Sequence, residues 1–174
     1  MKKNLGMLAL LAVGVAGCST SAQAPESASL SGADLEALTA AYQLITFDMA
    51  ECTLVQRQNL GLTVQPVATK ICADAQHYQP MLEMLAARHD VTLPNTLRYD
   101  LEAQYVALSY HPTPNLAVNY LNDQIGSHEQ ALAVFRYTAG TTADPDIKTL
   151  YQSAVPLVEQ NLASLRQALA ATPQ

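Results

Sequence analysis

Apolar side chains recur every three or four residues along most of the chain, and this period constrains the fold more than any other feature. Between Pro66 and His89 the stripe passes through Val67, Ile71, Tyr78, Met81 and Leu85. A period close to 3.6 places such residues on one face of an amphipathic helix. The chain also has no Trp and only two Phe, which suits helices packed on helices better than a sandwich or barrel. We therefore predict an all-α fold.

Four long segments carry this helical period. We predict helices over residues 34–61, 66–89, 114–137 and 145–170. The short connection at 62–65 makes the first two helices an antiparallel hairpin, whereas a long crossover with a short extra helix over 95–109 follows the second. This order predicts an antiparallel four-helix bundle over residues 34–172, with the crossover between its second and third helices.

Capping residues and prolines mark the ends of these helices. Ser31 or Asp34 can cap the first helix, because a short polar side chain can accept a backbone N–H of the first turn. Gly61 is a suitable stop for that helix, and Pro66 fits the first position of the next, where its missing N–H costs nothing. Asp144, directly before a proline, is the predicted cap of the last helix.

The N-terminus has the features of a secretory signal. Two lysines follow the first methionine, and the apolar run after them is too short to span a membrane as a helix. The run ends in Val15-Ala16-Gly17-Cys18, which resembles the lipobox of bacterial lipoproteins. That resemblance implies cleavage of a signal peptide, residues 1–17, and lipidation of Cys18; the alternative is an ordinary signal peptide that contains a Cys. Two or more acyl chains would anchor the protein stably in a membrane.

The segment after the lipobox, residues 18–33, reads as a lipidated Cys followed by a flexible tether. It is rich in Ser and Ala and too poor in large apolar groups to repay the ordering of the chain. By resemblance to lipoprotein sorting in Gram-negative bacteria, Ser19 in place of Asp implies the outer membrane. We therefore expect an outer-membrane lipoprotein whose helical domain faces the periplasm.

The charge of the chain bears on its partners. The net charge is -6, with only nine Lys and Arg residues and no basic run. Binding to phosphates requires a basic face, so we expect no nucleic-acid partner.

Several short motifs resemble those of one bacterial family. They are a Glu in the first helix, Gln76-His77, Leu93-Pro94, YLNDQIGSHEQALAVF from Tyr120 to Phe135, the run from Asp144 to Lys148, and Val155-Pro156. This pattern is similar to that of the uncharacterised bacterial outer-membrane family known as domain-of-unknown-function family 4142. The resemblance spans about Leu35 to Leu169 and implies a ferritin-like helical bundle. The chain differs from the family pattern at Gln76 and Asn161, where the family has Asp and His.

Four side chains are candidates for a metal site in the bundle interior. A rise of about 1.5 Å per residue places Glu51, His77 and His128 at comparable heights, and Asp74 lies one turn from His77. Ferritin-like proteins build di-metal sites from single Glu residues and Glu-x-x-His pairs, but here only Asp74 and His77 have such a spacing. We therefore consider a mononuclear site of Glu51, Asp74, His77 and His128 for Fe, Zn or Cu. The alternative is that both histidines are interior or boundary residues hydrogen-bonded to Asp74, Glu51 or backbone carbonyls.

Cys52 and Cys72 fall on the facing stripes of the first two helices. Thiols in an exported domain are oxidised, so we expect a disulfide between them. The bridge would close a loop of about twenty residues and contribute roughly 3 kcal/mol on the chain-entropy argument. The alternatives are two buried free thiols and a thiolate metal site that includes His77.

The sequence contains no motif that indicates catalysis. It has neither a Gly-rich phosphate loop nor a nucleophile elbow, so we name no catalytic residue. The expected function is a lipid-anchored periplasmic binding or envelope-structural module, whose partner is an unknown envelope protein or small ligand. The alternative is a metal-binding ferritin-like protein.

Overall fold

Five helices make up most of the chain that the structure, a computed structural model, describes, namely residues 29–110 and 113–173. They are α1 (Gly32–Arg57), α2 (Gly61–Arg88), α3 (Tyr99–Ser109), α4 (Thr113–Thr141) and α5 (Pro145–Ala171). No strand occurs among these residues. The all-α prediction is therefore confirmed.

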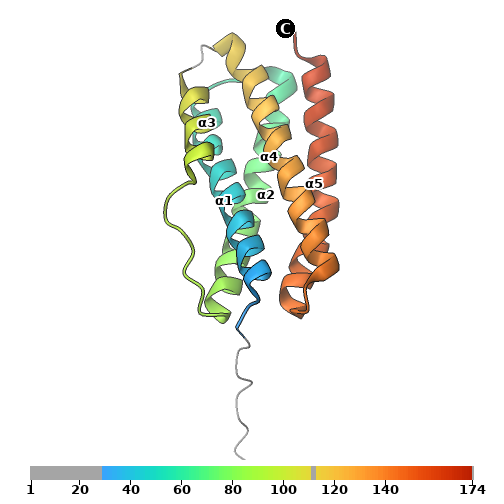
Figure 1. Cartoon of the computed structure of the whole chain (residues 1–174). Coiled ribbons are helices and arrows are strands. Elements are labelled where there is room, and N and C mark those ends of the chain that lie inside the picture. The colour runs from blue at the N-terminus through green and yellow to red at the C-terminus, as the bar shows by residue number, and fades with distance from the viewer. Residues whose placement is uncertain (1–28, 111–112, 174) are drawn as a thin grey trace, which may run out of the picture.

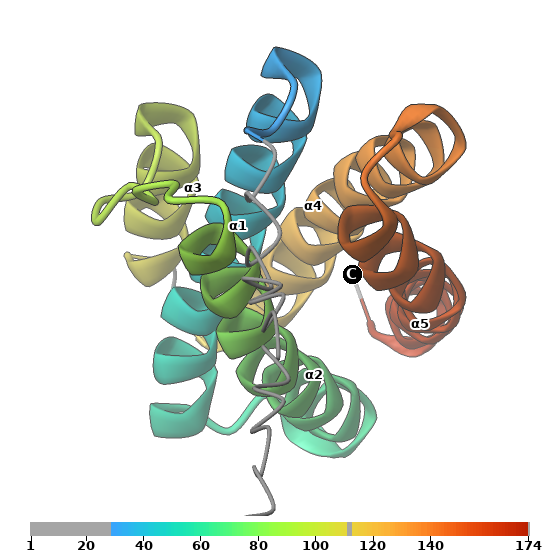
Figure 2. The same ribbon diagram turned by 90° about the horizontal axis from the view of Figure 1, so that it is seen from below.

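The four long helices form two hairpins that pack into a bundle (Figures 1 and 2). Helix α1 packs against α2 and α4, and α5 packs against α4 and α2. Each of these neighbouring pairs is antiparallel, because α1 and α5 run in one direction along the bundle and α2 and α4 in the other (Figure 1). The crossover from α2 to α4 carries the short α3, which covers α1 and α4 from outside. The predicted four-helix bundle with an extra helix in its crossover is confirmed.

The start of α1 and the segment before it define the N-terminal end of the domain. The predicted signal peptide 1–17, Cys18 and most of the tether lie outside the described residues. Leu30 already packs against the core, and the Ser31 hydroxyl caps α1 by accepting the Asp34 N–H at 3.1 Å. The folded domain therefore begins slightly before the predicted residue 34. None of the described helices combines the length and the apolar character needed to cross a bilayer.

The turn between α1 and α2 differs from the prediction. Helix α1 ends at Arg57, and α2 begins at Gly61, whose φ of 83° suits a glycine. The Asn59 carboxamide accepts the Gly61 N–H at 2.9 Å. The Gln65 side chain accepts the Leu60 N–H at 3.1 Å. These side chains supply the acceptors that open α2, so Pro66 lies inside the helix and not at its first position.

The crossover is held on α1 by one buried amide. The Gln43 side chain donates to the Thr96 carbonyl at 2.9 Å and accepts the Arg98 N–H at 2.6 Å. Because these backbone groups are bonded to Gln43, the helix predicted from residue 95 begins only at Tyr99. Helix α4 also continues to Thr141, past the predicted end at 137, whereas the predicted Asp144 cap of α5 is confirmed.

The bundle core consists of two apolar clusters with polar side chains between them. One cluster contains Phe135 and Tyr151, whose rings stack at 4.8 Å, and the other contains Cys52 and Cys72. We call the polar residues between them the polar layer: Asp48, Glu51, Lys70, Asp74, Gln124, Ser127, His128 and Asn161. The layer crosses the middle of the bundle and draws on all four long helices.

The predicted disulfide is present. Cys52 of α1 and Cys72 of α2 are bonded, with their Cα atoms 5.5 Å apart. Both residues are buried in the apolar cluster beside the polar layer. The bridge therefore ties the first hairpin together, and the two alternatives, free thiols and a thiolate metal site, are wrong.

Candidate functional site

A single buried amide organises the part of the polar layer that lies between α1 and α4. The Gln124 side-chain nitrogen donates to Glu51 Oε2 at 2.7 Å and to Asp48 Oδ1 at 3.0 Å. Both Glu51 and Gln124 have no exposed surface. Asp48 and Glu51 are three residues apart on α1, so they share a helix face and both reach Gln124. One donor group thus serves two carboxylates.

Burial of these carboxylates changes their ionisation. Burial raises the pKa of Glu51 well above its ordinary 4.5, the nearby Asp123 and Asp48 add to the rise, and the hydrogen bond from Gln124 opposes it. Burial also raises the pKa of Asp48 from 3.8, against the lowering effects of His128, Gln124 and Ser127. Burial therefore favours the protonated form of both carboxylates.

Three buried oxygens beside this pair have no hydrogen-bond partner within the described part of the chain. They are Glu51 Oε1, Gln124 Oε1 and Tyr120 Oη. Burial, followed by the negative charge of Glu51 and Asp48, raises the pKa of Tyr120 well above 10.0, so its hydroxyl keeps its proton.

His128 presents one nitrogen to the backbone and leaves the other available. Its Nδ1 lies 3.0 Å from the Gln124 carbonyl oxygen and 3.4 Å from the Ser127 hydroxyl. A carbonyl oxygen can only accept, so Nδ1 carries the hydrogen of this bond. In the neutral ring Nε2 is then an acceptor.

The other side of the polar layer joins α2 to α5. Asp74 Oδ2 accepts from Lys70 Nζ at 2.7 Å and from the Asn161 amide at 2.9 Å. Lys70 also donates to Asn161 Oδ1 at 2.7 Å. Asn161 is buried, whereas Lys70 and Asp74 are partly exposed. These three residues bridge the two hairpins.

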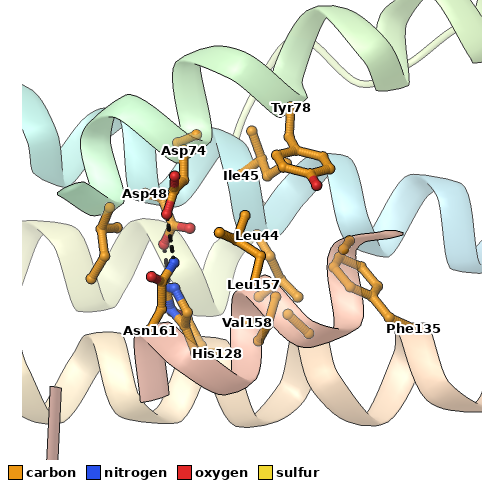
Figure 3. A pocket seen from close by; sticks show the side chains of 15 residues that line it. Leu44, Ile45, Asp48, Asp74, Tyr78, His128, Phe135, Leu157, Val158 and Asn161 are labelled. Atoms are coloured by element: carbon orange, nitrogen blue, oxygen red, sulfur yellow. Dashed lines mark hydrogen bonds between the residues drawn. The ribbon is translucent and has the colours of Figure 1, made fainter. Parts of the chain in front are cut away.

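A small cavity of about 50 Å³ adjoins the polar layer between the two hairpins. Asp48, Asp74, His128 and Asn161 gather at one end of it, whereas the other end is apolar (Figure 3). The apolar wall includes Leu44, Ile45, Tyr78, Phe135, Leu157 and Val158. One water molecule needs about 10–15 Å³ of such volume, so the cavity has room for a few water-sized groups.

Comparison with known proteins places the chain in a family. The model of a domain of unknown function, DUF4142, matches residues 19–168. The chain belongs to the DUF4142 family. Among solved structures, the crystal structure of a DUF305 fragment from Deinococcus radiodurans has a TM-score of 0.74 and 14% sequence identity, covering 83% of this chain and 99% of that one. At this identity the likeness concerns the fold alone. No curated protein matches the chain.

The four predicted metal ligands do not come together in this DUF4142 domain. His77 is exposed and its ring stands edge-on to that of Tyr78 at 5.3 Å, while Asp74 is bonded to Lys70. Helix α2 faces the cavity with Ile71, Ala75 and Tyr78, so His77 lies on the outer side of the helix. Among the described residues, no group of three or more His, Cys, Asp or Glu side chains is arranged to hold a metal ion. The residues present therefore do not fit the predicted mononuclear site, and the interior placement of His77 is wrong.

Only part of the polar layer of the DUF4142 domain is predictable from the sequence. Glu51 and His128 are buried as predicted. Asp48, Gln124 and Asn161 were not predicted to belong to the site. Their spacing in the sequence could have identified them, because each lies three or four residues from another polar or buried residue on the same helix face. An uncharged Gln or Asn within such a stripe is the clearest of these signals.

Proposed function

We propose that this protein is a lipid-anchored binding module of the cell envelope and that the cavity between its hairpins is the binding site. The observation that carries the proposal is the cavity itself, with a polar end and an apolar wall between four helices. Ligand sites commonly combine an apolar wall with a few polar groups that orient the ligand. The small volume points to a ligand of a few non-hydrogen atoms.

The energetic cost of the polar layer supports this proposal. Buried carboxylates and amides lose their hydration, and apolar residues of similar volume are often as stabilising or more so. Glu51 and Gln124 are nevertheless fully buried, and Gln124 donates to Asp48, which lines the cavity. Recognition of a ligand gives such residues a role that packing alone does not.

The proposed location rests on the lipobox and on the disulfide. Lipidation of Cys18 and the Ser19 that follows it would direct the protein to the outer membrane, with the domain in the periplasm. The bond between Cys52 and Cys72 suits an oxidising compartment of this kind. Helix α1 starts at the end of the bundle opposite the α1–α2 turn, so the anchor would attach at that end (Figure 1).

A neutral amphiphile tests whether the cavity binds anything. We expect n-propanol, titrated into isotopically labelled protein, to shift the NMR signals of residues such as Ile45 and His128 in a saturable manner. Ala154→Val adds two methyl groups at the cavity wall and should abolish the shifts. Ala163→Val, on the exposed face of the same helix, is the matched control for the β-branched side chain. Shifts confined to exposed residues, or shifts unaffected by Ala154→Val, would count against the proposal.

A further inference from the structure

We propose that the cavity selects a small primary ammonium ion with a short aliphatic tail, held by Asp48, Asp74 and His128. This inference rests on the proposed function of the cavity as a binding site. It names the class of ligand that the chemistry of the cavity would recognise.

The polar end of the cavity offers acceptors without donors to match them. Asp48 Oδ1 and Asp74 Oδ2 receive the hydrogen bonds given to these carboxylates by described residues, which leaves Asp48 Oδ2 and Asp74 Oδ1 available. In the neutral ring, His128 Nε2 is a third acceptor, because Nδ1 bonds the Gln124 carbonyl. All three residues line the cavity. A primary ammonium group has three N–H donors and no acceptor, so it complements this set.

The charge at this end also favours a cation. Lys70 compensates the carboxylate of Asp74 through their 2.7 Å ion pair. Among the described side chains, no Lys or Arg forms an ion pair with the Asp48 carboxylate. The Asp48 carboxylate therefore lacks the lysine partner that Asp74 has. A bound ammonium would neutralise it, whereas a bound carboxylate would be repelled.

The rest of the cavity limits the size of the ligand and determines its tail. A volume of about 50 Å³ accommodates roughly three or four groups of the size of water. Leu44, Phe135 and Val158 offer no polar partner at the apolar end. A chain of two or three methylene or methyl groups beyond the nitrogen would fill this end and bury its apolar surface.

A metal ion would satisfy the same negative charge but does not suit the geometry. Metal ligands must lie about 2.0–2.6 Å from one ion, and the described residues include no group of three His, Cys, Asp or Glu side chains that meets this need. An ammonium nitrogen sits about 2.7–3.2 Å from each acceptor and tolerates wider spacing.

Three solutes of equal length and different charge test the inference. We would titrate n-propylamine, n-propanol and propionate into the labelled protein at pH 7, where the amine is a cation, and follow His128 and the cavity methyl groups by NMR. A ligand of four non-hydrogen atoms binds weakly, so we expect a Kd for the amine of about 0.1–10 mM. We expect the amine to bind about tenfold more tightly than the alcohol, and propionate to leave the cavity signals unchanged.

Asp48→Asn should weaken amine binding about tenfold while leaving the alcohol unaffected, because it removes the charge and keeps the shape. Asp90→Asn is the matched control, since Asp90 is exposed, lies near the far end of α2 and has a positive φ that Asn tolerates. If Asp48→Asn does not fold, Ala154→Val replaces it and should abolish amine binding.

The outcomes separate this inference from the proposed function. Equal binding of alcohol and amine, or amine binding that Asp48→Asn does not change, overturns the ammonium inference and leaves the cavity as a binding site. Binding of propionate in preference to the amine overturns it in the same way. If none of the three solutes shifts the cavity signals, both the inference and the proposed function fail.

Discussion

Glu51 combines complete burial with an ionisable group, and this conflict has a measurable consequence. Its pKa is raised by burial, so the folded state binds a proton more tightly than the unfolded state does. Between the ordinary pKa of 4.5 and the raised value, unfolding releases a proton, and stability falls as the pH rises. The slope for one such group approaches about 1.4 kcal/mol per pH unit. Asp48 contributes with the same sign.

Glu51→Gln should therefore become more stable than the wild type as the pH rises. The amide keeps the acceptor for Gln124 and cannot ionise, so the two proteins should be similar near pH 4 and diverge above pH 4.5. Urea unfolding from pH 4 to pH 8 measures the difference. Glu36→Gln is an exposed replacement on the same helix, so its unfolding free energy should change with pH as that of the wild type does. A Glu51→Gln profile that also runs parallel would show that Glu51 ionises normally in the folded state.

The individual residues of the site were only partly predictable from the sequence. His128 could be placed in the interior because it falls on the apolar face of its helix, and Glu51 because it lies at a comparable height on the first helix. His77 could not be placed, since three residues from Asp74 on a helix corresponds to about 60° around the axis, enough to turn a side chain from the interior to solvent. The Asn161 to Asp74 contact joins residues 87 apart, and no local pattern encodes it.

At the scale of single elements, the disulfide gives the firmest prediction. The double variant Cys52→Ser, Cys72→Ser should lose about 3 kcal/mol of unfolding free energy, because the bridge closes a loop of about twenty residues in the unfolded chain. Urea unfolding with and without a reductant measures this. Reductant should lower the stability of the wild type and leave the variant unchanged. An equal response of both proteins would mean that the bridge does not form in solution.

The helices themselves were predictable, and their ends less so. The apolar period and the Asp144 cap fix α5 from local sequence alone. The start of α2 was missed because Asn59 and Gln65 supply side-chain acceptors ahead of Pro66. The start of α3 was missed because the Gln43 amide holds the preceding backbone from another helix. Contacts with residues outside the helix determine where these two helices begin. The apolar pattern of the helix alone does not reveal those contacts.

At the scale of the whole molecule, the lipobox predicts where the protein resides. Cys18→Ser removes the thiol that would be lipidated, so the protein should move from the detergent-rich phase of a Triton X-114 extraction to the aqueous phase. Cys52→Ser, which lies within the folded domain, is the control and should remain in the detergent-rich phase. Wild-type protein in the aqueous phase would contradict lipid anchoring.

The two apolar clusters and the polar layer together join the two hairpins. The disulfide lies within one hairpin, whereas Asn161, Asp74 and Lys70 cross between hairpins. A ligand in the cavity would touch all four long helices and add contacts that link the hairpins. The position of a bound ligand therefore decides whether the cavity links the two hairpins.

Nuclear Overhauser effects between n-propylamine and methyl-labelled protein locate the bound ligand. We expect a position in the cavity, with contacts from the propyl methyl group to Leu44 and Val158 and from the methylene next to nitrogen to the His128 ring. Contacts only to exposed apolar side chains such as Leu62 and Met84, with none to the cavity residues, would contradict it.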